Sequence, residues 1–255
     1  MNKAVKDLVY IDTHDSLMRV LQSWRLWVAG ALAGALIAAG VFAVFPPPYR
    51  ARAVVVVDLN IEDVYDIPPE RQFYFIGRET RKLQALAWSD ETIQLVADQV
   101  GGVSVRELRD ETLTLSQPED GSWYFFADHK DAGRAEEIAG AWAKTFYQQV
   151  LDGVEISEYL VVMREEIPKI FEQYQGINGG EASYLVEKMY PQMADSKGIS
   201  PYTEVSLSQV DQLQVVRKVP MSVYILAGAL IGACGLALAA LSILRAEEQD
   251  VFLAD

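Results

Sequence analysis

The stretch "VFAVFPPPYRARAVVVVDLN" (Val41–Asn60) places three consecutive prolines between an apolar run and a valine-rich run. Phe45 precedes a proline and is therefore disfavoured in helical conformation, which predicts that an apolar helix ends there. The prolines favour an extended polyproline step of about 9 Å. From Tyr49 onward small and apolar residues alternate with arginines, which predicts a strand. We interpret Pro46, Pro47, Pro48 and Tyr49 as a stiff positioning segment.

Two long apolar windows flank the rest of the chain. Residues 26–45 and 223–244 contain no charged residue, and a bilayer core of about 30 Å needs roughly 20 helical residues. The first window is too long for the apolar part of a signal peptide and has no evident cleavage site before the prolines. We therefore predict two transmembrane helices, in preference to two buried core helices. Two spans place both termini on one side of the membrane.

Basic residues predict the orientation. Lys3, Lys6, Arg19 and Arg25 precede the first window, so the positive-inside rule favours a cytoplasmic N-terminus. The rule does not help to orient the second window, because Arg217 and Lys218 precede it and only Arg245 follows. The predicted organisation is a cytoplasmic amphipathic lead-in (1–25), a first span (26–45), a periplasmic or extracellular domain (46–222), a second span (223–244) and a cytoplasmic tail (245–255). The tail is too short to form an output domain, which disfavours a sensor that signals within one chain.

Charge narrows the possible partners. The chain of 255 residues has a formal net charge of −14. Nucleic-acid binding needs clustered cations and is therefore disfavoured, and we attribute the acidity to solubility. The single cysteine, Cys234, cannot form an intramolecular disulfide.

Periodicity between the spans predicts alternating strands and helices. After the first strand, residues 70–87 read as a helix with Phe73, Ile76, Thr80, Leu83 and Leu86 on one stripe. Ser89 is a candidate N-cap for a second helix, which a glycine pair at 101–102 would end.

The remaining pattern resembles a compact mixed domain. Residues 111–128 predict a β-hairpin, residues 131–151 a helix and residues 210–219 a strand that leads into the second span. The order corresponds to the split β-α-β-β-α-β motif of ferredoxin-like domains, so the predicted fold class is an α+β membrane protein. Residues 152–208 are predicted to form a helical insertion, broken or kinked at Pro168.

Nothing in the sequence predicts catalysis. His14 and His129 fall on opposite sides of the membrane in the predicted topology and cannot share a metal. No phosphate-binding loop with a lysine is present. Asp58, Glu62, Asp63 and Asp66 lack the spacing of a calcium loop. We expect no enzyme activity and no catalytic, cofactor-binding or metal site.

Both spans contain a pair of glycines four residues apart. These are Gly30 and Gly34 in the first span and Gly228 and Gly232 in the second. Small residues at this spacing let helix backbones approach closely in membranes. Alanine-rich spans also produce the spacing by chance, so helix packing within or between chains is an expectation.

Four segments in order resemble Wzz-type chain length determinants, also called polysaccharide co-polymerases, which include membrane adaptors of bacterial tyrosine kinases. The segments are "YIDTHDSLMRVLQSWRLWV", "FPPPYRARAVVVVD", "TRKLQALAWSDETIQLVADQVG" and "WYFFADHKDAGRAEEIAGAWAKTF". The chain departs from the family in having one proline, Pro220, before the second span, where the family has several. Its helical insertion is also shorter and is interrupted by glycines.

The resemblance implies a non-enzymatic homo-oligomer that acts with a polysaccharide polymerase or export machinery in the lipid bilayer. It would set the chain length or export of an O-antigen, capsule or exopolysaccharide. Two alternatives stay open: an adaptor of a separate cytoplasmic tyrosine kinase, and an orphan two-span regulatory module.

Overall fold

The computed structural model describes residues 24–60, 68–116, 121–173, 189 and 191–254. Within it the chain divides into two compact units. One combines residues 1–47 with 217–255, and the other comprises residues 48–216.

The first unit contains two long apolar helices, α3 (Trp24–Val44) and α10 (Met221–Ala254). Both are long and apolar enough to cross a membrane, with mean hydropathies of 2.1 and 2.0 over Trp24–Val44 and Met221–Ala239. Only 6% of the first apolar window and none of the second is buried, whereas the core helix of a soluble protein would be mostly buried. Helix α10 does not end at residue 244 but continues through the sequence predicted as a tail.

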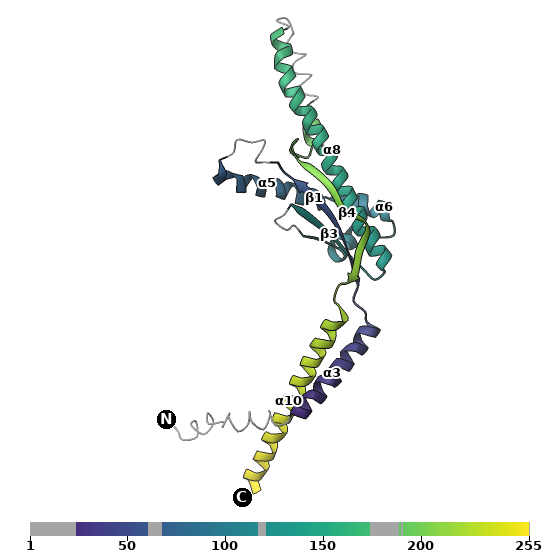
Figure 1. Cartoon of the computed structure of the whole chain (residues 1–255), viewed down its shortest axis with the longest axis vertical. Coiled ribbons are helices and arrows are strands. Elements are labelled where there is room, and N and C mark those ends of the chain that lie inside the picture. The colour runs from purple at the N-terminus through teal and green to yellow at the C-terminus, as the bar shows by residue number, and fades with distance from the viewer. Residues whose placement is uncertain (1–23, 61–67, 117–120, 174–188, 190, 255) are drawn as a thin grey trace. The chain divides into compact units, whose positions relative to one another are not determined.

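The second unit is built on a four-stranded sheet (Figure 1). The strands are β1 (Tyr49–Asp58), β2 (Leu113–Ser116), β3 (Ser122–His129) and β4 (Glu204–Arg217), in the order β2-β3-β1-β4. Strand β3 pairs antiparallel with both β2 and β1, with Tyr49 opposite His129 at one end of the β1 ladder. The first and last strands of the domain are therefore neighbours in the sheet.

Helices and strands alternate along the chain in the predicted order of strand, helices, hairpin, helix and strand. The helices are α5 (Pro69–Ala87), α6 (Asp90–Val100), the short α7 (Val105–Glu107), a π-helical turn η1 (Leu108–Thr112) and α8 (Ala132–Gln173). The predicted N-cap is confirmed: the Ser89 hydroxyl accepts a hydrogen bond from the Thr92 N–H, which satisfies one free donor of the first turn. Gly101 ends α6 with a φ of 67°, a conformation that glycine adopts without a steric penalty.

The core lies between one face of the sheet and helices α6 and α8. On β1 the alternating residues Ala51, Ala53, Val55 and Val57 are buried, as the predicted alternation requires. Aromatic rings fill the layer: Phe125 and Phe146 each contact a neighbouring ring, and Trp142 lies edge-on to Phe125 with their ring centroids 4.9 Å apart. The indole N–H of Trp142 donates to the Ala87 carbonyl oxygen at 2.9 Å, so this buried polar group is satisfied.

The boundary predicted at Asp152 is wrong as a helix end. Helix α8 runs without a break from Ala132 through Pro168 to Gln173 and extends beyond the sheet (Figure 1). Gly153 is buried, and a Cβ added there would lie 3.0 Å from the Ser196 carbonyl oxygen and 2.6 Å from Ile199 Cδ1. Glycine here permits close packing against residues 196–199, and it does not terminate the helix.

Two other expectations differ from the structure. Strand β4 begins at Glu204, six residues before the predicted start, so the predicted insertion overlaps both α8 and β4. The apolar stripe predicted for α5 is buried only in its second half. Leu83 and Leu86 lie in the core, whereas Phe73 is 86% exposed and Ile76 is 43% exposed.

Several predictions lie outside the described residues. They concern the amphipathic lead-in with His14, the carboxylates Glu62, Asp63 and Asp66, and residues 174–188 of the predicted helical insertion.

Candidate functional site

The segments that connect each apolar helix to the sheet are held together within the first unit. Pro46 and Pro47 follow α3 in non-helical conformation, and Pro47 is buried. The guanidinium of Arg217, at the end of β4, donates from Nη1 to the Pro47 carbonyl oxygen at 2.7 Å. A charged donor makes a stronger hydrogen bond than a neutral one. This contact joins positions 170 residues apart in the sequence.

The other predicted positioning residues lie beside this contact in the sequence. Pro48 precedes β1, and Tyr49 is the first residue of β1. Pro220 directly precedes α10, and its carbonyl oxygen accepts a hydrogen bond from the Val223 N–H at 3.1 Å. Pro220 therefore contributes to the first turn of α10.

The four glycines predicted for helix packing lie at the contact between α3 and α10. A Cβ built on Gly30 would lie 2.6 Å from the Gly232 carbonyl oxygen, and one built on Gly34 would overlap the Gly228 carbonyl oxygen. Gly228 and Gly232 face Gly34 and Gly30 in return. The two backbones are thus so close that no side chain fits between them, the geometry that small residues permit in membranes.

The neighbouring glycines Gly40 and Gly235 do not share this geometry, since an added Cβ at either would meet nothing within 4 Å. Rings pack nearer the ends of the helices that lead to the sheet, where Phe42 and Tyr224 make an edge-on contact with centroids 5.3 Å apart. The helix pair therefore has one close glycine contact with larger side chains beside it.

The outer face of the sheet carries a pair of arginines on β1. Arg50 forms a two-pronged ion pair with Asp128 on β3, with both nitrogen–oxygen distances at 2.7 Å. The hydrogen bond from Arg50 to Asp128, together with the attraction of the two charges, raises the pKa of Arg50 despite partial burial. Arg52 lies over the Tyr124 ring, with its guanidinium carbon 5.3 Å from the centroid.

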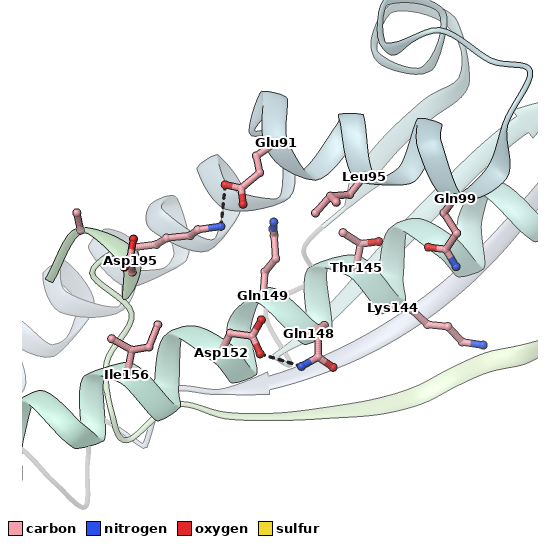
Figure 2. A pocket seen from close by; sticks show the side chains of 12 residues that line it. Glu91, Leu95, Gln99, Lys144, Thr145, Gln148, Gln149, Asp152, Ile156 and Asp195 are labelled. Atoms are coloured by element: carbon pink, nitrogen blue, oxygen red, sulfur yellow. Dashed lines mark hydrogen bonds and ion pairs between the residues drawn. The ribbon is translucent and has the colours of Figure 1, made fainter. Parts of the chain in front are cut away.

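Figure 2 shows a groove of about 860 Å³ between α6, α8 and residues 194–197. Polar side chains line most of it. Ion pairs and hydrogen bonds fix several of them: Lys197 bonds Glu91 at 3.0 Å, and Gln148 donates to Asp152 at 2.8 Å. Its lining residues are Glu91, Leu95, Gln99, Lys144, Thr145, Gln148, Gln149, Asp152, Ile156, Ala194, Asp195 and Lys197.

Gln149 lies at the floor of this groove and is 7% exposed. Its Oε1 accepts a hydrogen bond from the Thr92 hydroxyl at 2.5 Å. Among the described residues, its Nε2 has no acceptor. A buried amide donor without an acceptor is unfavourable, so within the described residues this side chain reduces the stability of the fold.

Helix α5 is anchored at one end and exposed at the other. Lys82 pairs with Glu79 at 2.9 Å and donates to the Gly198 carbonyl oxygen at 2.8 Å. Four residues earlier, Arg78 lies over the Phe75 ring at 4.8 Å from its centroid. Tyr74 is 63% exposed. Periodicity alone did not predict that the first half of α5 is exposed. The apolar residues keep the same helical spacing in the exposed half and in the buried half.

The described residues contain no group of three or more His, Cys, Asp or Glu side chains placed to hold a metal ion. Within this part of the chain, His129 uses Nδ1 to accept the Asp131 N–H at 3.0 Å. Asp58 likewise accepts the Asn60 N–H, at 3.0 Å. Both side chains therefore support local turns.

No protein-family model matches the chain, and a search of curated proteins finds no match. Among solved structures the chain is similar to a full-length bacterial polysaccharide co-polymerase. The two share 13% sequence identity with a TM-score of 0.35, over 90% of this chain and 97% of that one.

Proposed function

We propose that the protein is a membrane-anchored polysaccharide co-polymerase. It is a non-enzymatic homo-oligomer that regulates the chain length or export of a surface polysaccharide by acting with the polymerase or export machinery. It lies in the cytoplasmic membrane with two spans, both termini in the cytoplasm and the central domain outside.

One observation carries the proposal. The two strands that continue in sequence into the apolar helices, β1 and β4, are neighbours in one sheet. The two apolar helices themselves pack against each other through glycines. The domain is thus connected in sequence to both apolar helices through neighbouring strands of one sheet, which suits a protein that works by holding an external domain at the membrane.

The sequence resemblance supports the same function. Three of the four segments that resemble the co-polymerase family correspond to described elements: the proline step with β1, the α5–α6 pair with the Ser89 cap, and β3 with the first half of α8. We further propose that the domain is ferredoxin-like, because the chain order strand-helix-strand-strand-helix-strand is that of the split β-α-β-β-α-β motif. The order of the segments between two apolar helices is far more specific than any one of them.

Deleting the gene tests this function. We expect the surface polysaccharide of the deletion strain, separated on a gel, to change in modal length or yield, and the wild-type gene to restore it. Expression of Gly34→Ile should fail to restore it, because its side chain would overlap the α10 backbone. Gly40→Ile, at a position where an added Cβ meets nothing within 4 Å, should restore it at the same membrane level by immunoblot.

An unchanged length distribution and yield in the deletion strain would overturn the proposal. Reporter fusions at residues 23, 130 and 255 test the topology independently. We expect the outer two positions to report cytoplasm and the central one to report the opposite side.

A further inference from the structure

The exposed half of α5 presents an aromatic and basic stripe whose ring, ionic and hydrogen-bond contacts, among the described residues, are with its own helix. Tyr74, Gly77, Arg78 and Arg81 follow the spacing i, i+3, i+4, i+7, which places them on one helix face. Tyr74 is 63% exposed, and a Cβ added at Gly77 would meet nothing within 4 Å. Phe73, beside the stripe, is 86% exposed.

The arginines of this stripe are available for a further charge. Within the described part of the chain, Arg81 hydrogen-bonds only to the Gly77 carbonyl oxygen of its own helix, at 3.0 Å. Arg78 pairs with the adjacent Glu79 at 3.0 Å, while 47% of its side chain is exposed. Large exposed aromatics beside partly exposed arginines are typical of a protein contact surface, because monomers rarely leave such patches uncovered.

The exposed part of α8 presents a stripe of opposite character. Glu155, Glu158, Tyr159 and Val162 have the same spacing, i, i+3, i+4, i+7. All four are exposed, Tyr159 at 49% and Val162 at 58%. Among the described residues neither glutamate forms an ion pair. The carboxylates lie at the N-terminal end of this stripe and the apolar side chains toward its C-terminal end.

The two stripes are complementary when the helices run antiparallel. Both span about 10.5 Å of helix. Antiparallel alignment sets Arg81 against Glu155 and Arg78 against Glu158, and it sets Tyr74 against Val162. In the same register Tyr159 falls opposite Gly77, the one position of the α5 stripe without a side chain. Two ion pairs, one apolar pair and one ring over a glycine then form a continuous contact.

Both stripes are exposed among the described residues, so they do not cover each other within one chain. We propose that the α5 stripe docks antiparallel on the α8 stripe of a second copy of this chain. This inference rests on the proposed function in one respect: the proposed function includes a homo-oligomer, so the partner is taken to be a second copy. Because the two surfaces differ, each copy contacts one neighbour through its α5 stripe and another neighbour through its α8 stripe. Such a head-to-tail contact closes into a ring when its rotation permits.

Cysteine cross-linking of the full chain in mild detergent tests the register. In a Cys234→Ala background we combine Tyr74→Cys with Val162→Cys. Oxidation should give a ladder of dimers and higher species, since the two positions meet only between copies. The matched control combines Ile76→Cys with Arg164→Cys, both exposed but on the opposite sides of the same helices. Equal ladders from the two pairs would overturn the register.

Charge exchange tests the surface independently. Arg81→Glu alone and Glu155→Arg alone should each weaken assembly by about tenfold, because like charges then face each other. The double variant should restore assembly, measured as native mass against dilution. Gly77→Leu should weaken assembly without lowering the thermal midpoint of the fold, since nothing lies within 4 Å of an added Cβ and leucine has the higher helix propensity. Failure of the double variant to recover would refute the contact.

A membrane surface is the alternative partner for an aromatic and basic helix. An environment-sensitive fluorophore attached at Tyr74→Cys, in lipid nanodiscs, distinguishes the two partners. Emission that shifts with protein concentration supports a second copy. Emission that shifts with anionic phosphatidylserine content and not with concentration overturns the proposal. If the wild type assembles but charge exchange and cross-linking fail, this contact is wrong and the polysaccharide function stands. If the deletion strain makes unchanged polysaccharide while the ladder forms, the function is wrong and the contact stands.

Discussion

Substituting Gly34 by alanine should separate the two apolar helices. A Cβ at this position would lie 2.9 Å from the Gly228 carbonyl carbon and 3.0 Å from Gly232 Cα, whereas carbon atoms in contact lie about 3.5–4.0 Å apart. The Gly228 carbonyl oxygen lies closer still. Since all three obstructing atoms belong to backbone, the helices must move apart by about 1 Å. A gap of that size forfeits roughly a quarter to a half of the dispersion attraction across the contact. We expect the substitution to cost about 1–3 kcal/mol, the range for an overpacked interior.

The separation can be measured by dipolar broadening between nitroxide labels on Val41→Cys and Val223→Cys, in a Cys234→Ala background. These residues line the apolar crevice between α3 and α10. Gly34→Ala should reduce the broadening and lower the thermal midpoint of the full chain in nanodiscs. Gly40→Ala and Gly235→Ala are matched controls, because each adds the same methyl group where nothing lies within 4 Å. If Gly34→Ala and Gly40→Ala give the same spectrum, the close glycine contact is not what holds these helices together.

Three further predictions concern the second unit, residues 48–216, each measured by chemical or thermal unfolding of the full chain. Asp128→Ala should cost about 2–4 kcal/mol, because it leaves the partly buried Arg50 guanidinium without its carboxylate. The pKa of Arg50 is raised, so the stability that this arginine contributes is fully present at any pH below its pKa in the unfolded chain. Raising the pH from 7 to 10 should therefore leave unchanged the difference in unfolding free energy between the wild type and Asp128→Ala. A difference that shrinks over this range would contradict the reasoning. Gly153→Ala should cost about 1 kcal/mol net, since crowding against the Ser196 carbonyl oxygen outweighs the gain in helix propensity; a stabilised variant would show that α8 is not closely packed there. Ser89→Ala should cost about 1 kcal/mol by removing the N-cap of α6, and Ser89→Asp should recover most of it.

Local signals in the sequence were sufficient for much of this fold. The N-cap at Ser89, the glycine end of α6 and the helix predicted over residues 131–151 each follow from residues close together in the chain. The alternation on β1 was equally readable, because one face of that strand is buried along its length. These features depend on contacts whose chemistry is already present in the local pattern.

The failures have a common physical cause. Whether Gly153 ends a helix or lets another segment approach depends on residues 196–199, which lie far along the chain. The α5 stripe has one periodicity but two environments, because the core covers Leu83 and not Phe73. The buried amide of Gln149 is equally invisible to pattern, since its environment comes from three separate segments. Long-range packing decides these points, and a single sequence does not encode it in any short window.

Because α8 is unbroken, it mechanically connects the core to the surface beyond the sheet. Trp142, fully buried in the core, and Tyr159, exposed beyond it, belong to one helix and lie about 25 Å apart along its axis. An α-helix bends little over that distance without a kink. A force applied at Tyr159 by a neighbouring molecule therefore becomes a torque on the aromatic layer beneath the sheet. Core substitutions such as Trp142→Phe should consequently loosen contacts made far from the core, at a surface they never touch.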